Sequence, residues 1–297
     1  MKAKASRFID WRKTMKYIVV LGDGMADEPV GEIGGMTPLE YAKTPAMDSI
    51  APKSEIGLVH TIPEGMKPGS DTANLAVLGY NPEKYYTGRS PLEALSIGVP
   101  MKDTDIAIRC NIVTLSDDNL PYGEKTITDH SSSEISTEDA AILMEAVQKE
   151  LNSDIYQFYV GTSYRHLTIW DKGEVTELTP PHDILGRVIG EYLPEDARLR
   201  EMMEKSYDIL NNHPLNVERA KKGLNKANSI WFWGAGTRPA LDSFEGRFGK
   251  KGAMISAVDL LKGIAEGTQM LNRDVPGANG ILETNWEGKA EAAVKVL

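Results

Sequence analysis

The chain has 297 residues, 41% hydrophobic and 26% charged, which is the composition of an ordinary globular protein with one large domain or two smaller ones. Lys plus Arg is 33 and Asp plus Glu is 43, so the formal net charge of −10 argues against broad binding to nucleic acid or anionic membranes. The single cysteine, Cys110, excludes an internal disulfide and favours a reducing cytoplasm. No apolar run approaches the roughly 20 residues of a membrane span.

The first 14 residues are polar, with Arg7 and Arg12, and lack the apolar segment of a secretory signal. We interpret residues 1–14 as an N-terminal extension. The apolar run Tyr17–Leu21 ends in Gly22-Asp23-Gly24, which predicts a buried parallel strand whose carboxyl end turns into a functional loop. Further elements predicted before residue 100 are a strand at 56–62 and helices at 44–50, 71–79 and 90–97, the last opened by a capping box at Ser90-Pro91-Leu92-Glu93.

After Pro100 the pattern changes to helices mixed with antiparallel-looking strands. The predicted strands cover 106–115, 158–160 and 166–170, and the predicted helices cover 137–151, 183–189 and 195–210. We therefore expect residues 101–215 to form a second, inserted domain. The first pattern resumes afterwards, with strands at 229–233 and 253–256 and helices at 258–265 and 287–297. Residues 15–100 and 216–297 are accordingly predicted to form the parent domain.

Ser70 and Asp71 stand at the start of a predicted helix, in the run Gly69-Ser70-Asp71-Thr72-Ala73-Asn74-Leu75. A serine there suits a metal-activated nucleophile, because a divalent cation lowers the hydroxyl pKa and the helix N-terminus attracts a phosphoryl group. Asp23, at the end of the predicted first strand, could face the same cleft. The simpler alternatives stay open: Ser70 as a plain N-cap, and Asp23 as a turn residue.

Arginines form a second set of candidates. Arg109 lies inside an apolar strand, Arg165-His166 begins another, and Arg89 and Arg238 follow glycine turns. The planar guanidinium binds carboxylate and phosphate with two parallel hydrogen bonds, although structural salt bridges would explain these residues equally well. The five histidines show no metal-binding spacing, and the chain has no phosphate loop or dinucleotide turn, which disfavours ATP- and NAD-dependent functions. We interpret Cys110 as a packing thiol.

The segments at 20–27, 68–75 and 86–94 resemble the archaeal-type cofactor-independent phosphoglycerate mutases, of the alkaline phosphatase superfamily. The likeness continues through Arg109-Cys110-Asn111, residues 163–167, 181–186, 233–236 and 255–260, and Gly288-Lys289-Ala290. The resemblance implies an α/β fold, with a three-layer α/β/α core and a smaller inserted α+β domain that closes over the substrate.

By the same resemblance, a serine takes phosphate from 2- or 3-phosphoglycerate and returns it to the other hydroxyl of the retained glycerate. Ser70 matches that nucleophile and, with Asp23, matches ligands of two divalent cations (manganese, magnesium, cobalt or zinc). Arg109, Arg165, His166 and Arg238 match positions that would bind the small phosphorylated acid.

Two departures from the family pattern stand out. Residues 128–137 differ from the Gly- and Arg-containing segment expected before Ile135-Ser136-Thr137. The family also continues past the Gly288-Lys289-Ala290 helix into strands with Asp and His metal ligands, whereas no histidine follows His213 here. We therefore expect an incomplete copy that does not bind both cations alone. Alternative functions are a phosphatase or phosphotransferase of the same superfamily, and a non-catalytic phosphoglycerate-binding protein.

Overall fold

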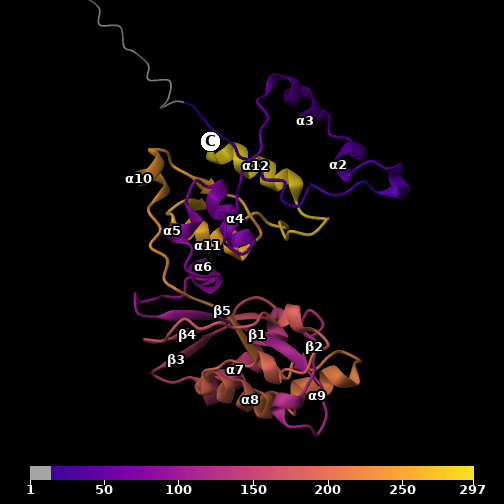
Figure 1. Cartoon of the computed structure of the whole chain (residues 1–297), viewed down its shortest axis with the longest axis vertical. Helices are drawn as coiled ribbons and strands as arrows, with labels where there is room; N and C mark the ends of the chain where they lie inside the picture. Colours follow the sequence, from indigo (N-terminus) through magenta and orange to yellow (C-terminus); the bar gives the residue numbers. More distant parts are fainter. Residues whose placement is uncertain (1–14) are drawn as a thin grey trace, which may run out of the picture. The chain divides into compact units, whose positions relative to one another are not determined.

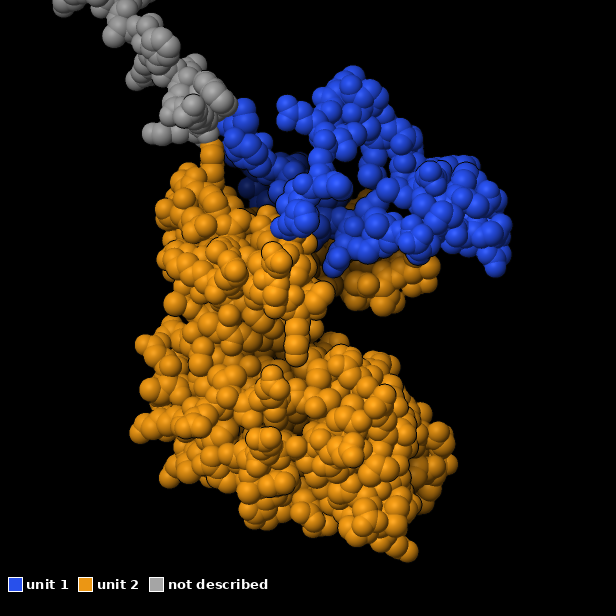
Figure 2. Space-filling model, viewed as in Figure 1, with its two compact units in different colours: residues 1–60, 290–297 blue, residues 61–289 orange. Residues whose placement is uncertain are grey.

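The computed structural model describes residues 15–297, which divide into two compact units (Figures 1 and 2). The first unit comprises residues 1–60 and 290–297, and the second comprises residues 61–289. The predicted extension at 1–14 lies outside the described residues. Helix α12 (Trp286–Val296) runs across the boundary in the sequence.

The first unit consists of short helices joined by extended chain. Its helices before residue 60 are η1 (Gly31–Ile33), α2 (Pro38–Tyr41), α3 (Pro45–Ile50) and η2 (Ala51–Lys53). Thr37 opens α2 with a capping box, because its hydroxyl accepts from the Glu40 amide at 3.2 Å and Glu40 Oε2 accepts from the Thr37 amide at 2.8 Å. No described residue of this unit is buried. Local hydrogen bonds such as this capping box, and not a hydrophobic core, therefore stabilise its short elements.

The strands predicted at Tyr17–Leu21 and 56–62 are wrong: both segments are without regular structure. Most of their side chains are exposed, with Val20 at 89% and Leu58 at 101% of full exposure. An apolar run supplies strand propensity, but a strand also needs a neighbour to pair with its backbone N–H and C=O groups. Neither segment belongs to a sheet of the described chain.

The second unit holds most of the regular structure. Its strands are β1 (Ile106–Leu115), β2 (Ile127–Asp129), β3 (Tyr156–Tyr159), β4 (Arg165–Trp170), β5 (Ser229–Thr237), β6 (Ala253–Met254) and β7 (Leu271–Asn272). Its helices are α4 (Ser70–Val77), α5 (Pro82–Tyr85), α6 (Arg89–Ser96), η3 (Tyr122–Glu124), α7 (Thr137–Leu151), η4 (Pro181–Ile184), η5 (Gly190–Tyr192), α8 (Ala197–Leu210), α9 (Pro214–Lys221), α10 (Phe244–Phe248) and α11 (Asp259–Gly267).

Within the described residues, β1 to β5 form one antiparallel sheet with β1 at its centre. β4 pairs along one edge of β1 and β5 along the other, and β3 extends the sheet beyond β4. Residues 229–233, which the sequence pattern grouped with the parent domain, thus pair with a strand of the middle segment. β5 completes the sheet of the middle segment, because β1 is buried over its whole length and needs partners on both edges.

Side-chain alternation gives this sheet two different faces. Ile106, Ile108 and Cys110 belong to the largest hydrophobic core, in which α7 and α8 pack against the sheet (Figure 1). Ala107 belongs to a smaller cluster with Ala94 of α6 on the other face. Burial raises the pKa of the Cys110 thiol to about 12, so the prediction of a packing thiol is confirmed.

A separate core lies among α4, α5, α6 and α11, built on Leu75, Tyr80, Leu92 and Ile264. Beside it, β6, α11 and β7 form a βαβ unit, in which Ala253 and Met254 pair in parallel with Leu271 and Asn272. These short strands form the parallel sheet of the described chain. The architecture is thus mixed α/β, as predicted.

Two local predictions are wrong. Residues 183–189 form no α-helix, since only η4 (Pro181–Ile184) reaches into that segment. Ser90 caps no helix either: α6 begins at Arg89 with Gly88 as its N-cap, and the Ser90 hydroxyl donates to the Gly234 carbonyl at 2.6 Å. Ser90 therefore joins α6 to β5, and Glu93 is left free for another partner.

The contact between α6 and α11 depends on Gly263. A Cβ at this position would lie 1.7 Å from the Leu92 carbonyl oxygen, a backbone atom that cannot move aside. We predict that Gly263→Ala lowers the free energy of unfolding by about 2 kcal/mol or more through overpacking. Gly31→Ala is the control, because a Cβ there has open space. Denaturant unfolding measures both variants, and equal effects would contradict the close approach.

Candidate active site

Ser70 is the first residue of α4, with an exposed side chain. The N-cap is Gly69, in extended conformation, and no side chain caps the helix. The simpler interpretation of Ser70 as an N-cap is therefore wrong. Its hydroxyl lies at a helix N-terminus, where free amides and the helix dipole favour an anion.

Asp71 links the start of α4 to the segment before α6. Its Oδ2 accepts from the Tyr86 hydroxyl at 2.8 Å and its Oδ1 accepts from the Thr72 amide at 2.9 Å. Burial and the Asp71 carboxylate raise the pKa of Tyr86. The charge of Arg89 lowers this pKa, and the charge of Glu93 raises it. The Ser70 end of α4 is therefore joined through Tyr86 to the segment that carries Arg89.

Arg109 is 4% exposed, and its charge is balanced by Glu93 of α6. Alternation along β1 places Arg109 on the face of Ala107, toward α6. Its Nε also donates to Asn111 Oδ1 at 3.2 Å, and its guanidinium lies 4.8 Å from the ring centroid of Trp233, its partner on β5. Burial lowers the pKa of Arg109, while the Glu93 carboxylate opposes this shift.

Two further arginines lie near this pair. Arg89 Nε donates to the same Glu93 oxygen at 3.0 Å, and Arg165 is 4.0 Å from Asp259 Oδ2 of α11. The charge of Arg165 adds to the lowering of the Arg109 pKa. Three guanidinium groups thus face two carboxylates. This excess of positive charge suits an anionic ligand.

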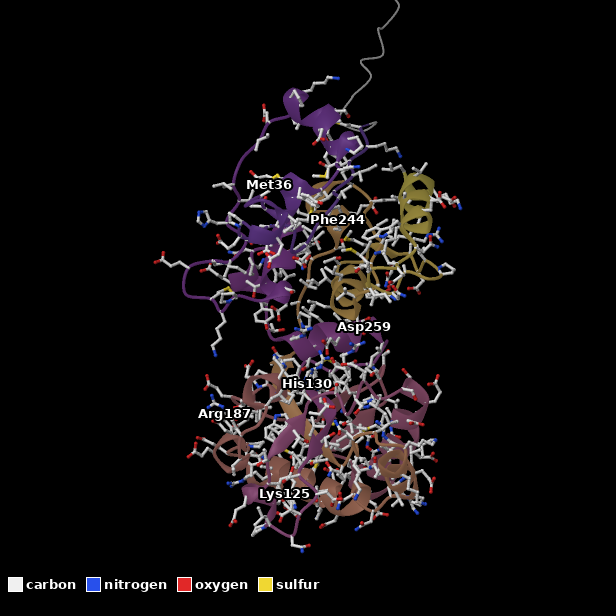
Figure 3. The ribbon with its side chains drawn as sticks, turned by 90° about the vertical axis from the view of Figure 1, so that its right-hand side faces the viewer. Met36, Lys125, His130, Arg187, Phe244 and Asp259 are labelled. Carbon is white, nitrogen blue, oxygen red and sulfur yellow. The ribbon has the colours of Figure 1, made fainter. Side chains whose placement is uncertain are left out.

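A row of aromatic rings connects Arg165 with Arg89 and Arg109. The guanidinium of Arg165 lies over the ring of Tyr164, and this ring contacts His130 edge-on. The His130 ring in turn contacts His182 edge-on. The rings of His182 and Trp233 also meet edge-on, with their centroids 5.3 Å apart. In Figure 3, His130 lies between Asp259 and Lys125 along the vertical direction of the view. Of this row, the sequence singled out neither His130 nor His182, because neither belongs to a recognisable metal or catalytic spacing.

A strained turn follows His130. Ser132, Ser133 and Glu134 have φ values of 51°, 60° and 47°, a left-handed region that such residues seldom occupy. Asp129 stabilises the turn by accepting from the Ser131 amide at 2.8 Å and the Ser133 amide at 2.6 Å. Backbone strain of this kind is common at functional sites. The turn directly follows His130, whose ring contacts Tyr164.

His166 is buried, and its Nδ1 accepts from the Gly161 amide at 3.1 Å. Burial, reinforced by the charges of Arg109 and Arg165, lowers its pKa to about 3, so the ring is neutral near pH 7. It pairs with Cys110 on β1, and alternation directs it away from the face of Arg109 and Arg165. The His166 side chain therefore starts from the other face of the sheet, although the residue lines a small cavity together with Arg165 and Glu93.

Two sequence candidates remain, Arg238 and Asp23. Arg238, at the end of β5, forms an exposed ion pair with Asp103 at 3.0 Å. Asp23 lies in a turn of the first unit, whereas Ser70 belongs to the second. Across residues 15–297, no three or more His, Cys, Asp or Glu side chains gather in a way that could hold a metal ion.

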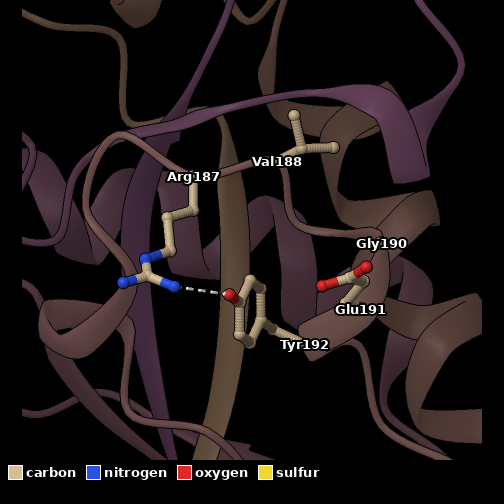
Figure 4. A pocket seen from close by; sticks show the side chains of 5 residues that line it. All are labelled: Arg187, Val188, Gly190, Glu191 and Tyr192. Atoms are coloured by element: carbon tan, nitrogen blue, oxygen red, sulfur yellow. Dashed lines mark hydrogen bonds between the residues drawn. The ribbon is translucent and has the colours of Figure 1, made fainter.

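A surface hollow of about 520 Å³ is lined by Arg187, Val188, Gly190, Glu191 and Tyr192 (Figure 4). Arg187 there donates to the Tyr192 hydroxyl at 3.0 Å. None of the candidate residues lines this hollow, so the arginine cluster is the better candidate site.

Among residues 15–297 no helix has the length and apolar character to cross a bilayer.

Comparison with known proteins gives the family. The sequence model described as 2,3-bisphosphoglycerate-independent phosphoglycerate mutase matches residues 51–216. The protein of that name from Methanosarcina barkeri is 50% identical over 288 residues, which cover 95% of this chain and 71% of the relative. This chain belongs to that family. The resemblance inferred from the sequence is confirmed, and the family name denotes isomerases that interconvert 2- and 3-phosphoglycerate.

Other relatives agree. A probable mutase of this family from Geobacter sulfurreducens is 48% identical, over 95% of this chain and 71% of its own length. A solved structure from Pyrococcus horikoshii matches with a TM-score of 0.71 and 30% identity, over 92% of this chain and 65% of that one. The cofactor-independent phosphoglycerate mutase of Thermoplasma acidophilum matches with a TM-score of 0.52 and 28% identity, over 92% and 72%.

Removing the Glu93 charge tests the buried ion pair. We predict that Glu93→Gln lowers the free energy of unfolding by about 3 kcal/mol, because it leaves the Arg109 charge buried without a counterion. Asp103→Asn is the control, since Asp103 is 90% exposed in its pair with Arg238. We expect this control to change stability by no more than about 0.5 kcal/mol in the same denaturant titration.

The pKa of His166 predicts a pH dependence of stability. Unfolded His166 takes up a proton near pH 6.5, whereas the folded side chain stays neutral down to about pH 3. The unfolded state therefore binds more protons in this window, and the free energy of unfolding falls as the pH drops from 6.5 toward 3.

His166→Asn keeps an acceptor for the Gly161 amide and should make this decline shallower, as measured by unfolding at a series of pH values. His60→Asn, at an exposed site, should leave the slope as it is in the unaltered protein. A decline of the same steepness in His166→Asn would show that other groups cause it.

Proposed function

We propose that this chain interconverts 2- and 3-phosphoglycerate with Ser70 as the residue that carries the phosphate. The Ser70 oxygen attacks phosphorus, the bond to the glycerate oxygen breaks, and that oxygen takes up the serine proton. The retained glycerate then presents its other hydroxyl, which attacks the phosphoserine and releases Ser70. The observation that carries this proposal is that the Ser70 hydroxyl, at the start of α4, caps no helix and is exposed.

The start of α4 supports this role electrostatically. Backbone amides at a helix N-terminus are directed at an approaching anion, and the dipole favours the charge that gathers on phosphate oxygens in the transfer. The adjacent carboxylate of Asp71 is engaged by the Tyr86 hydroxyl and the Thr72 amide, which hold it in a fixed position beside the reacting group.

We propose that Arg109 and Arg165 bind the anionic groups of phosphoglycerate, together with Arg89 and His130. The excess of positive charge over Glu93 and Asp259 supports this assignment. His166 acts one step removed: by accepting from the Gly161 amide it supports the turn that precedes Arg165. Arg238 is also proposed as a substrate ligand, which would have to replace its exposed ion pair with Asp103.

The division into domains is part of the same proposal. Residues 15–100 and 216–297 would form a three-layer α/β/α core, and residues 101–215 a lid that retains glycerate between the two transfers. The pairing of β5 with β1 requires the lid to include residues 229–237 as well. The βαβ unit of β6, α11 and β7 supports a parallel sheet in the core.

The family resemblance implies two divalent cations, with Asp23 and Ser70 among their ligands. Asp23 and Ser70 belong to different units, and among the described residues no group of three or more His, Cys, Asp or Glu side chains that could hold a metal ion is found. The steps above therefore assign work only to side chains and backbone of this chain. A cytoplasmic location likewise stays a prediction from the sequence.

Replacing Ser70 tests the proposed nucleophile. We predict that Ser70→Ala lowers the rate of 2- to 3-phosphoglycerate exchange at least about 10³-fold, because no other group would accept the phosphate. The assay includes manganese, and Ser49→Ala, an exposed helical serine, is the control. Mass spectrometry after acid quenching should find phosphate on Ser70. Unchanged exchange in Ser70→Ala would contradict the proposal, and phosphate release without exchange would indicate a phosphatase.

A further inference from the structure

Two ion pairs of the described chain join the antiparallel sheet to the helices beside it, and they differ in kind. Arg109 and Glu93 are in direct contact, with 4% and 15% of their side chains exposed. Arg165 and Asp259 are 4.0 Å apart, too far for a hydrogen bond, with 39% and 38% exposed. The first pair is a fixed connection between α6 and β1. The second costs little to break.

The surroundings of Arg165 leave its guanidinium incompletely bound. Its Nε is buried and has no hydrogen-bond partner among the described residues. A cavity of about 30 Å³ lies beside the pair, lined by Glu93, Ile97, Gly161, Thr162, Arg165, His166, Leu167 and Asp259. A space of this size holds about one water molecule, so the pair is not packed in place. Arg165 thus keeps donors that a ligand could use.

Asp259, in contrast, is held in position by its helix. It lies in the first turn of α11, where the helix dipole stabilises a carboxylate. The contact of Gly263 with Leu92 fixes α11 against α6. Of the two partners, the long side chain of Arg165 is therefore the one that can move.

We propose that Asp259 is a positioning residue that withholds Arg165 from the anion site until phosphoglycerate competes for it. This inference rests on the proposed function, in which Arg165 binds the substrate. A phosphate and a carboxylate on one ligand present more negative charge, and more acceptors for a planar guanidinium, than the single distant carboxylate of Asp259. Substrate therefore draws Arg165 away, and weaker anions leave it paired.

The test measures the dissociation constant of 3-phosphoglycerate by calorimetry at one ionic strength. Asp259→Asn releases Arg165 and should tighten binding about two- to fivefold, the range expected for losing an exposed ion pair. Asp259→Glu keeps the pair and should bind like the unaltered protein. Asp274→Asn is the matched control, because Asp274 pairs with Lys262 of the same helix, with 81% of its own side chain exposed.

A double-mutant cycle separates this role from a general effect of charge. In an Arg165→Gln background, Asp259→Asn should no longer change the dissociation constant. The same tightening in that background, or weaker binding in Asp259→Asn alone, would overturn the inference. If Arg165→Gln alone left binding unchanged, Arg165 would not be a ligand. The inference would then fail, whereas phosphate on Ser70 would still support the mutase.

Discussion

The contact between Glu93 and Arg109 is the interaction on which the candidate site depends. A guanidinium in the middle of a buried strand is stable only with a counterion. Helix α6 packs against this face of the sheet, and its Glu93 carboxylate is that counterion. The same glutamate accepts from Arg89, so one carboxylate fixes two cationic groups at the junction of α6 and β1. The partner on β5, Trp233, covers both guanidinium groups with its ring.

Helix α6 therefore belongs to two packing systems at once. Leu92 packs in the core with α4 and α11, and Ala94 packs against the sheet. Through Tyr86 and Asp71, the segment before α6 also reaches the start of α4, where Ser70 lies. The proposed nucleophile is therefore connected to α6 through Asp71 and Tyr86, and Arg89 and Arg109 are connected to it through Glu93. In this arrangement a single helix contacts residues of the proposed site that are far apart in the sequence.

The sequence predicted elements with a clear period well and elements that depend on neighbours poorly. Helix α7 and strand β1 have the predicted bounds, because their patterns of apolar residues are long and uninterrupted. The runs at 17–21 and 56–62 are also rich in strand-forming residues but form no strand in the described chain. The pairing of β5 with β1 could not be predicted for the same reason: a run of apolar residues does not specify which strand lies beside it.

The site shows the same division. Arg109 and Arg165 could be identified because a charge inside an apolar strand, or at its start, is conspicuous. The role of Glu93 could not, since the sequence pattern assigned it to a capping box that the structure does not contain. His130 and His182 come together only through the fold, from segments about 50 residues apart. Local pattern contains no information on such pairs.

The buried Cys110 has a practical consequence. Its thiol is fully enclosed in the core, and burial holds it in the unreactive protonated form. Since it is the chain's sole cysteine, a fluorophore or spin label directed at an engineered surface thiol would attach at that position alone in the folded protein. Domain movement could then be followed spectroscopically without first replacing a native residue of the core.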